Sequence, residues 1–233
     1  GKPLLIEKPL ACTGTEAREM VQSAHAAGVP LMTAQTLRFD PAVLALKEAL
    51  ATAGRRRYLV LTNRIEPRPE LRKNPTDCAG RGALLEIGIH LLDLIRFLTG
   101  EEVAEVRCDL NGSSPGTPES RAWVSLRTAG GLPCILDVSR VGAGRMSRAE
   151  WIGERAQIIA DWSRHRLCRI SSGYAIEEWT VPDCPTVLAT LQAFLDAIEY
   201  GRPMPITGRD GQKAVEIADA CYESAASGQT VRL

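Results

Sequence analysis

Seven strand-like segments follow one another between residues 103 and 180, and this series constrains the fold more than any other feature. Short turns join several of them, such as Ala129-Gly130-Gly131 and Ser171-Ser172-Gly173. Consecutive strands joined by short turns pair antiparallel, because a parallel pair needs a crossover of a dozen or more residues. The sequence therefore predicts a large, mainly antiparallel sheet. Its expected strands are 103–110, 121–128, 132–140, 147–153, 155–161, 164–170 and 174–180.

Predicted helices flank this series on both sides. Asp40-Pro41 is typical of a helix start, with an N-cap residue followed by proline in the first turn. A strand over 58–65 and a proline-broken loop to Gly82, with Pro67, Pro69 and Pro75, separate two of the helices. The expected helices are about 40–51, 84–98, 186–200 and 209–227. Strands flanked by helices indicate an α+β domain with the helices on one face of an open sheet.

The other face of that sheet needs a cover. We expect a second subunit to supply it, in a homodimer or homotetramer formed through the open sheet face. The apolar strand residues that suggest this are Ile135, Val138, Val141, Trp151 and Ile158.

The first 36 residues have a different pattern. The apolar run 3–6, a helix that begins near Thr13 and Glu16, and the apolar run 29–34 form a strand-helix-strand unit. Such a unit belongs to a parallel sheet with further strands. We therefore interpret residues 1–36 as the last part of a doubly wound α/β domain, and residues 37–233 as a separate α/β domain for substrate and assembly. The chain is expected to be part of a longer protein.

Composition and charge exclude several classes of function. The 28 basic and 28 acidic residues balance, so no global field favours nucleic acid or an anionic membrane. No apolar run approaches the roughly 18 residues of a membrane span. The seven cysteines are scattered and contain no Cys-x-x-Cys pair. This pattern argues against a disulfide framework and a zinc site and favours the cytoplasm.

Two clusters of residues carry candidate chemistry. The first, Glu7-Lys8-Pro9, follows the opening strand, and ligands of open α/β sheets bind outside the carboxyl ends of strands. A lysine there would donate to a cofactor ribose or a substrate hydroxyl, although a surface lysine at a strand end has the same pattern. The second cluster is Glu86, His90 and Asp93, which a helix places on one face.

Three interpretations of His90 remain open on the residues alone. It is a buried histidine satisfied by acidic neighbours, a metal ligand, or a general acid–base oriented by a carboxylate. The metal interpretation lacks partners, because the other two histidines, His25 and His165, lie in different contexts. We therefore predict no metal site.

The ordered motifs resemble those of the Gfo/Idh/MocA oxidoreductase family, which includes glucose–fructose oxidoreductase and inositol dehydrogenase. They are Glu7-Lys8-Pro9, then Arg38-Phe39, then Gly-x-Gly-Ala-Leu-Leu-x-x-Gly-x-His-x-x-Asp-x-x-Arg over residues 80–96. The segment 214–231 is similar to the family's last helix. The resemblance covers essentially the whole chain and implies a Rossmann domain that binds NAD or NADP, followed by an open-sheet domain used for oligomerisation.

The resemblance also implies roles for individual residues. Lys8 contacts the substrate hydroxyl and the nicotinamide ribose, His90 is the catalytic histidine, and Glu86 stands where the family usually has aspartate. The Lys8–Pro9 bond matches one that is often cis. The catalytic residues implied are His90, Lys8 and Glu86; those for substrate binding are Arg38 and Asp93; those for cofactor binding are Glu7, Lys8, Pro9 and Gln35.

This resemblance predicts an NAD(P)-dependent oxidoreductase that transfers hydride between nicotinamide and a sugar or polyol. The family's glycine-rich phosphate loop has no counterpart in the 233 residues, since neither 80–82 nor 142–147 continues to a third glycine. We therefore expect the chain alone to bind dinucleotide weakly and to be inactive. Two alternatives remain: a non-catalytic binding, assembly or regulatory module derived from the family, and a metal-dependent lyase or isomerase.

Overall fold

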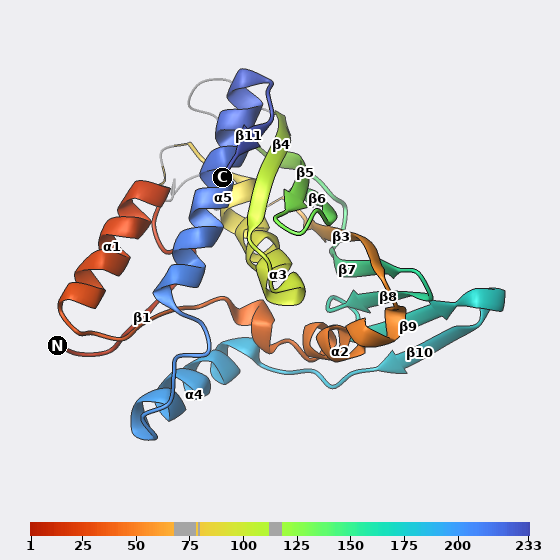
Figure 1. The fold of residues 1–233 in the computed structure, drawn as a ribbon, viewed down its shortest axis with the longest axis horizontal. Helices are drawn as coiled ribbons and strands as arrows, with labels where there is room; N and C mark the ends of the chain where they lie inside the picture. The colour runs from red at the N-terminus through yellow and green to blue at the C-terminus, as the bar shows by residue number, and fades with distance from the viewer. Residues whose placement is uncertain (68–77, 79, 112–117) are drawn as a thin grey trace.

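The computed structural model describes residues 1–67, 78, 80–111 and 118–233. A small sheet and a large sheet are bridged by long helices, and the small sheet lies at the N-terminal end of the chain (Figure 1). Both layers expected from the sequence are present, so the α/β plus α+β fold class is confirmed.

The small sheet is a single strand-helix-strand unit. Strands β1 (Leu4–Ile6) and β2 (Leu31–Thr33) pair in parallel, and helix α1 (Gly14–Ala26) connects them. Thr13 and Glu16 form the predicted capping box, in which each side chain accepts from the other residue's backbone N–H. The division into domains at residue 36 stays a prediction.

The large sheet has nine strands in the order β10-β9-β8-β7-β3-β6-β5-β4-β11. All seven strands predicted between residues 103 and 180 form, and each pairs antiparallel with its neighbour in sequence except where β3 intervenes. They are β4 (Val103–Asn111), β5 (Arg121–Thr128), β6 (Pro133–Ser139), β7 (Met146–Gly153), β8 (Ala156–Asp161), β9 (Arg166–Ser171) and β10 (Ile176–Thr180).

Two features of this sheet were not predicted. Strand β3 (Arg56–Arg64) inserts between β6 and β7, pairing parallel with β6 and antiparallel with β7. The short strand β11 (Val231–Arg232) pairs with β4 and forms one edge of the sheet. Both pairings are long-range in sequence, which is why local patterns do not reveal them.

Helices α2, α3 and α5 cover one face of the large sheet. Their apolar faces and the inward residues of the strands form one continuous core. Short helical turns link the main elements. The segments are η1 (Thr36–Phe39), α2 (Pro41–Ala49), η2 (Leu50–Ala53), η4 (Leu84–Gly88), α3 (Ile89–Thr99), η5 (Ser172–Tyr174), α4 (Thr186–Glu199) and α5 (Gly208–Ser227).

No helix covers the opposite face of the large sheet in the described residues. Three of the five apolar residues that we expected on that face do not lie there. Val138, Trp151 and Ile158 are buried under the helices, whereas Ile135 and Val141 are about half exposed. Side chains alternate between the two faces of a strand, so the core side takes every second residue. A list of apolar residues alone does not separate the two faces.

Helix α5 joins the small sheet to the large one. It packs against α1 and β2 on one side and against β4 on the other (Figure 1). A Cβ atom at Gly211 would lie 2.3 Å from Oγ1 of Thr33, so only glycine permits this approach of α5 to β2. The candidate site described below therefore draws on two sheets held by one helix.

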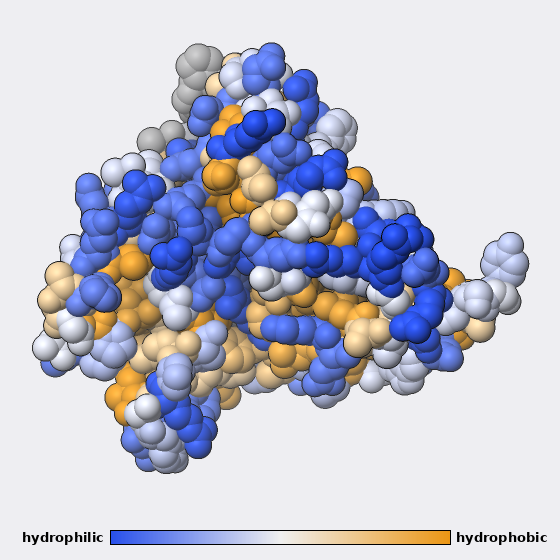
Figure 2. All heavy atoms as spheres, in the orientation of Figure 1, coloured by the Kyte–Doolittle hydropathy of each residue, from blue (hydrophilic) through white to orange (hydrophobic). Residues whose placement is uncertain are grey.

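Apolar side chains remain exposed in two places outside the large sheet. A groove between β1, β2 and α1 is lined mainly by apolar residues, including Leu4, Ile6 and Met20. On α4, Val187, Leu188, Leu191, Leu195 and Ile198 are each more than 40% exposed. Apolar atoms gather around α1 and along α4 (Figure 2). Within the described ranges, no helix is long and apolar enough to cross a membrane.

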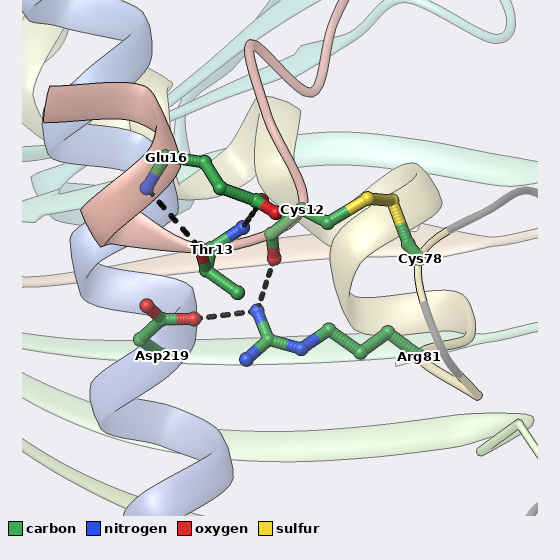
Figure 3. Close-up of a disulfide and its surroundings, with 6 residues drawn as sticks. All are labelled: Cys12, Thr13, Glu16, Cys78, Arg81 and Asp219. Carbon is green, nitrogen blue, oxygen red and sulfur yellow. Dashed lines mark hydrogen bonds and ion pairs between the residues drawn. A yellow bond between two sulfur atoms is a disulfide. The ribbon is translucent and has the colours of Figure 1, made fainter. Parts of the chain in front are cut away.

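The cysteine pattern argued against a disulfide framework, but the structure contains one disulfide. Cys12 and Cys78 form a disulfide, with their Cα atoms 5.0 Å apart (Figure 3). They are 66 residues apart in sequence, so only the fold brings them together. The remaining cysteines, at 108, 134, 168, 184 and 221, are free thiols.

The disulfide lies beside a polar cluster that ties the same segments together. Nη1 of Arg81 donates to the main-chain oxygen of Cys12 at 2.5 Å and pairs with Asp219 on α5 at 2.5 Å (Figure 3). The Gly14 N–H donates to the other oxygen of Asp219 at 2.6 Å. These contacts connect the segment after Lys8 to the segment that precedes α3.

Candidate functional site

The sequence predicted one α-helix carrying Glu86 and His90. The structure has a helix there, but its first turn is not α-helical. It begins with a π-helical turn, η4, and continues as α3. Such π turns occur frequently at functional sites, because they change which side chains share a face. Glu86 lies in the π turn and His90 in the first turn of α3.

Glu119 fixes the start of this helix. Its buried carboxylate accepts from the backbone N–H groups of Gly82 and Leu84, at 2.7 and 2.8 Å, and from the hydroxyl of Tyr222 at 2.8 Å. A Cβ atom at Gly82 would lie 2.1 Å from the Glu119 main-chain oxygen, so this glycine is required by the close approach. The acceptor satisfies N–H groups that a helix start leaves unpaired.

Lys8 reaches this helix from the carboxyl end of β1. The Lys8–Pro9 peptide bond is cis, as the resemblance predicted. Nζ of Lys8 donates to the main-chain oxygen of Glu86 at 2.7 Å, across 78 positions in sequence. Glu7, in contrast, is exposed. The bond brings the ammonium to within one helical turn of His90.

His90 faces Gln35, which follows β2. Nδ1 of His90 lies 3.1 Å from Oε1 of Gln35, and the Gln35 side chain is only 1% exposed. Burial, and secondarily the positive charge of Lys8, lowers the pKa of His90 to about 3. The imidazole is therefore neutral at physiological pH, and part of its surface stays open to solvent.

Glu86 has a partner that the sequence did not suggest. Its carboxylate forms an ion pair with the guanidinium of Arg140, the residue that follows β6. The Arg140 side chain is mostly buried, and that of Glu86 is one-third exposed. The extra methylene of glutamate, relative to aspartate, thus carries the charge to an arginine on the sheet.

One turn beyond His90, the helix carries a different cluster. Arg38 binds both carboxylate oxygens of Asp93, at 2.7 and 2.6 Å, and its Nη2 lies 3.1 Å from Asp210. Arg96 holds the same Asp210 oxygen at 2.9 Å and pairs with Glu102. The carboxylate of Asp93 is buried and engaged by Arg38.

In this cluster, burial and the neighbouring charges shift the pKa values in opposite directions. Burial raises the pKa of the Asp93 carboxyl, whereas Asp93 and Asp210 outweigh burial and raise the pKa of Arg38. The bidentate geometry of Arg38 and Asp93 is that of an ionised pair. For Asp210, burial opposes ionisation, but Arg38 and the Thr207 cap outweigh it and lower the pKa to about 2.

The structure thus divides the predicted site residues into two groups and adds Glu119 and Arg140, which were not predicted. Lys8, Gln35, Glu86 and His90 converge where β1, β2 and the start of α3 meet. Asp93, on α3, and Arg38, on η1, bind each other. Local sequence patterns gave no signal for Glu119 or Arg140, because their partners are distant in sequence. No group of three or more metal-binding side chains is present in the part of the chain that the structure describes.

This arrangement supports proton transfer at a hydroxyl. A neutral imidazole accepts a proton, and an adjacent ammonium stabilises the oxygen that loses it. A carboxylate and a guanidinium beside them offer an acceptor and donors for further hydroxyl groups.

Comparison with known proteins identifies relatives over the whole chain. The model of the GFO/IDH/MocA C-terminal domain matches residues 43–159. D-apiose dehydrogenase of Paraburkholderia graminis is 28% identical, covering 100% of this chain and 67% of the relative. Myo-inositol 2-dehydrogenase of Thermotoga maritima is also 28% identical, covering 100% of this chain and 73% of the relative.

A solved structure of levoglucosan dehydrogenase, in complex with NADH and levoglucosan, has the same fold. Its TM-score is 0.88 at 23% identity, covering 99% of this chain and 74% of that one. The fold, the family model and the full-length relatives agree. The chain therefore belongs to the Gfo/Idh/MocA family of oxidoreductases.

Proposed function

We propose that this chain carries the catalytic site of an NAD- or NADP-dependent dehydrogenase or reductase that acts on a sugar or polyol. One observation supports it most: the bond from Lys8 Nζ to the Glu86 main chain brings an ammonium next to the neutral imidazole of His90. Residues from the end of β1 and from the helix formed by η4 and α3 converge there, although 78 positions separate Lys8 from Glu86.

The residues present fit a nicotinamide. Lys8 and Gln35 stand at the carboxyl ends of β1 and β2, the edge at which doubly wound sheets bind ligands. Glu7 and Pro9 belong to the same turn. A bound nicotinamide would supply the acceptor or donor of hydride. The pyrophosphate site lies outside what these residues offer, since the sequence contains no Gly-x-Gly-x-x-Gly.

In the oxidative direction, His90 takes the proton of the substrate hydroxyl as the carbinol C–H bond breaks. A bound NAD⁺ or NADP⁺ would accept the electron pair of that bond as hydride, which would leave a carbonyl. Lys8 stabilises the oxygen while it carries negative charge. In the reductive direction the same groups polarise the carbonyl and return the proton.

The names of the relatives and the polarity of the site support a sugar or polyol as substrate. D-apiose and myo-inositol carry several hydroxyl groups, which match a site with paired donors and acceptors. Glu86 and Arg140 are suited to hold hydroxyl groups next to the reacting one. For Arg38 and Asp93, the bidentate pair favours a positioning role over direct substrate binding.

A non-catalytic module of the same family is the second candidate. The observation in its favour is the Glu86–Arg140 pair, because a carboxylate held by arginine is less available to orient a substrate. Such a module would keep its fold and ligand binding while losing turnover. A metal-dependent lyase or isomerase has no ligand set in the described residues to support it.

Assembly and location belong to the same proposal. The open sheet face exposes Tyr58, Trp123 and Ile135, each more than 40% exposed, and a homodimer or homotetramer would cover them. A cytoplasmic location stays a prediction. The Cys12–Cys78 disulfide counts against it, since disulfides are rare in that compartment.

The test uses the protein produced from its complete gene. A panel of aldoses and polyols is assayed with NAD⁺ and NADP⁺, and the corresponding lactones and ketoses with NADH and NADPH, following absorbance of the reduced nicotinamide. The proposal expects turnover of at least one polyhydroxylated substrate. Tight binding of panel members without any turnover would instead support the non-catalytic module.

A further inference from the structure

The contact between His90 and Gln35 decides whether the site has a base. Neutral imidazole carries one proton, and the hydrogen bond that one ring nitrogen makes selects which nitrogen holds it. Here Nδ1 lies 3.1 Å from Gln35 Oε1, so Nδ1 holds the proton when the amide oxygen accepts it. The other nitrogen, Nε2, then keeps its lone pair.

We infer that Gln35 is a positioning residue that holds His90 in the Nδ1–H tautomer and so leaves Nε2 as the proton acceptor. The inference rests on the proposed function for its purpose, but not for its geometry. It assigns Gln35 a role that acts through His90, in addition to the cofactor contact that the family resemblance implies.

The reversed amide orientation gives a site without a base. If Gln35 donated its NH₂ to Nδ1, Nε2 would carry the proton. Lys8 Nζ and Arg140 are also donors. Glu86 would then be the acceptor among these four side chains, and His90 could not take a proton.

Burial makes the choice strict. The Gln35 side chain is 1% exposed, so water does not replace its oxygen as the partner of Nδ1. Gln35 is also anchored in place, since it follows β2 and begins η1, the turn that carries the Arg38–Asp93 pair. Lys8, beyond β1, is the charged group that acts on the ring. The elements packed around η4 and α3 also carry Glu86 on η4, Arg140 beyond β6, Arg38 on η1 and Asp93 on α3.

The tautomer is measurable on this chain without any substrate. The sequence contains three histidines, His25, His90 and His165, so selective ¹⁵N labelling of histidine gives a spectrum that can be fully assigned. Long-range proton–nitrogen correlation reports which ring nitrogen is protonated. We expect roughly nine-tenths or more of His90 as Nδ1–H, since a tenfold preference corresponds to about 1.4 kcal/mol.

Two variants test the cause. Gln35→Leu removes the acceptor, and we expect His90 to shift by about tenfold or more toward the Nε2–H form that free neutral histidine favours. Gln35→Glu keeps an acceptor at the same place, so Nδ1–H should persist, and the pKa of His90 should rise because a carboxylate faces the ring. His25 and His165 should keep their wild-type signals in both variants and serve as folding controls.

An Nε2–H majority in the wild-type chain would overturn the inference, and so would an unchanged tautomer in Gln35→Leu. The wild-type measurement holds even if the leucine variant does not fold. Lack of turnover with every substrate would overturn the proposed function and leave the tautomer result standing. The two failures are therefore distinguishable.

Discussion

Two polar clusters share one face of the helix formed by η4 and α3, and they differ in how fully their groups are paired. Around Asp93, Arg38 and Asp210, guanidinium groups bind carboxylates at 2.6–3.1 Å. Around His90, the imidazole is neutral, and its one described polar contact is with Gln35. The first cluster consists of ion pairs within the protein, whereas the second contains a base that can react with a ligand.

The difference separates support from chemistry. Ion pairs connect η1, α3 and the start of α5, and these contacts fix the position of the helix that carries His90. Burial and the ammonium of Lys8 lower the pKa of His90, and perturbed groups of this kind cluster at functional sites.

Removing Asp93 should have the largest effect on stability. Asp93→Ala leaves Arg38 buried with only Asp210 for a partner, and breaking a buried pair costs about 3–5 kcal/mol. Chemical denaturation of the variant measures the loss in free energy of unfolding.

The matched control is an exposed pair on the sheet. Glu105 lies 3.2 Å from Arg127, and both side chains are about one-third to one-half exposed. Glu105→Ala should cost about 0–1 kcal/mol, because solvent screens exposed pairs. Equal losses in the two variants would contradict the view that the Asp93 cluster is the structural one.

The disulfide should stabilise the same scaffold. Replacing Cys12 and Cys78 with serine removes a crosslink across 66 residues, and such crosslinks typically contribute about 2–4 kcal/mol. Thermal unfolding with and without a dithiol reductant checks this. Reductant should lower the Tm of the wild type but not that of the double variant, and no difference in the wild type would mean that the bond does not form.

His90 should make stability depend on pH. Its folded pKa of about 3 lies below the ordinary value of about 6.5, so between these values the unfolded chain binds a proton that the folded chain does not. Stability from this group is therefore complete above about pH 6.5 and is lost as pH falls toward 3, at up to about 1.4 kcal/mol per pH unit.

His90→Asn should flatten the stability profile in that pH window, measured by denaturation at several pH values. His25→Asn, on an exposed position of α1, is the control and should keep the wild-type slope. Equal slopes in the two variants would mean that His90 is not held neutral.

The smallest effect is expected at Glu86. Glu86→Asp shortens the side chain by one methylene and weakens its ion pair with Arg140. Because the carboxylate is one-third exposed, we expect a change in KM of a few-fold, about 1 kcal/mol, with kcat nearly unchanged. Steady-state kinetics check this, and a large fall in kcat alone would place Glu86 closer to the reaction than we propose.

Most of the fold was predictable because its signals are local. Alternating strands, turn residues and the Thr13–Glu16 capping box each depend on neighbours within a few positions. The parallel pairing of β3 with β6, the π turn and the Cys12–Cys78 bond depend on packing between distant segments. No periodicity in the sequence reports on such contacts.

The candidate site shows the same division. Lys8 and His90 stand in motifs that a reader of the sequence can find, and the structure brings them to one place. Arg140 and Glu119 do not belong to any short motif, because their roles exist only through partners on other elements. Whether Asp93 faces a substrate or an arginine was equally out of reach, since Arg38 lies 55 positions away.

The most direct test of the account is His90→Ala in the protein produced from its complete gene, with turnover and unfolding measured on the same preparation. If His90 is the base, kcat should fall by roughly 10²–10⁴-fold, with little change in the free energy of unfolding at neutral pH. Unchanged turnover together with a clear loss of stability would contradict the account and return His90 to a structural role.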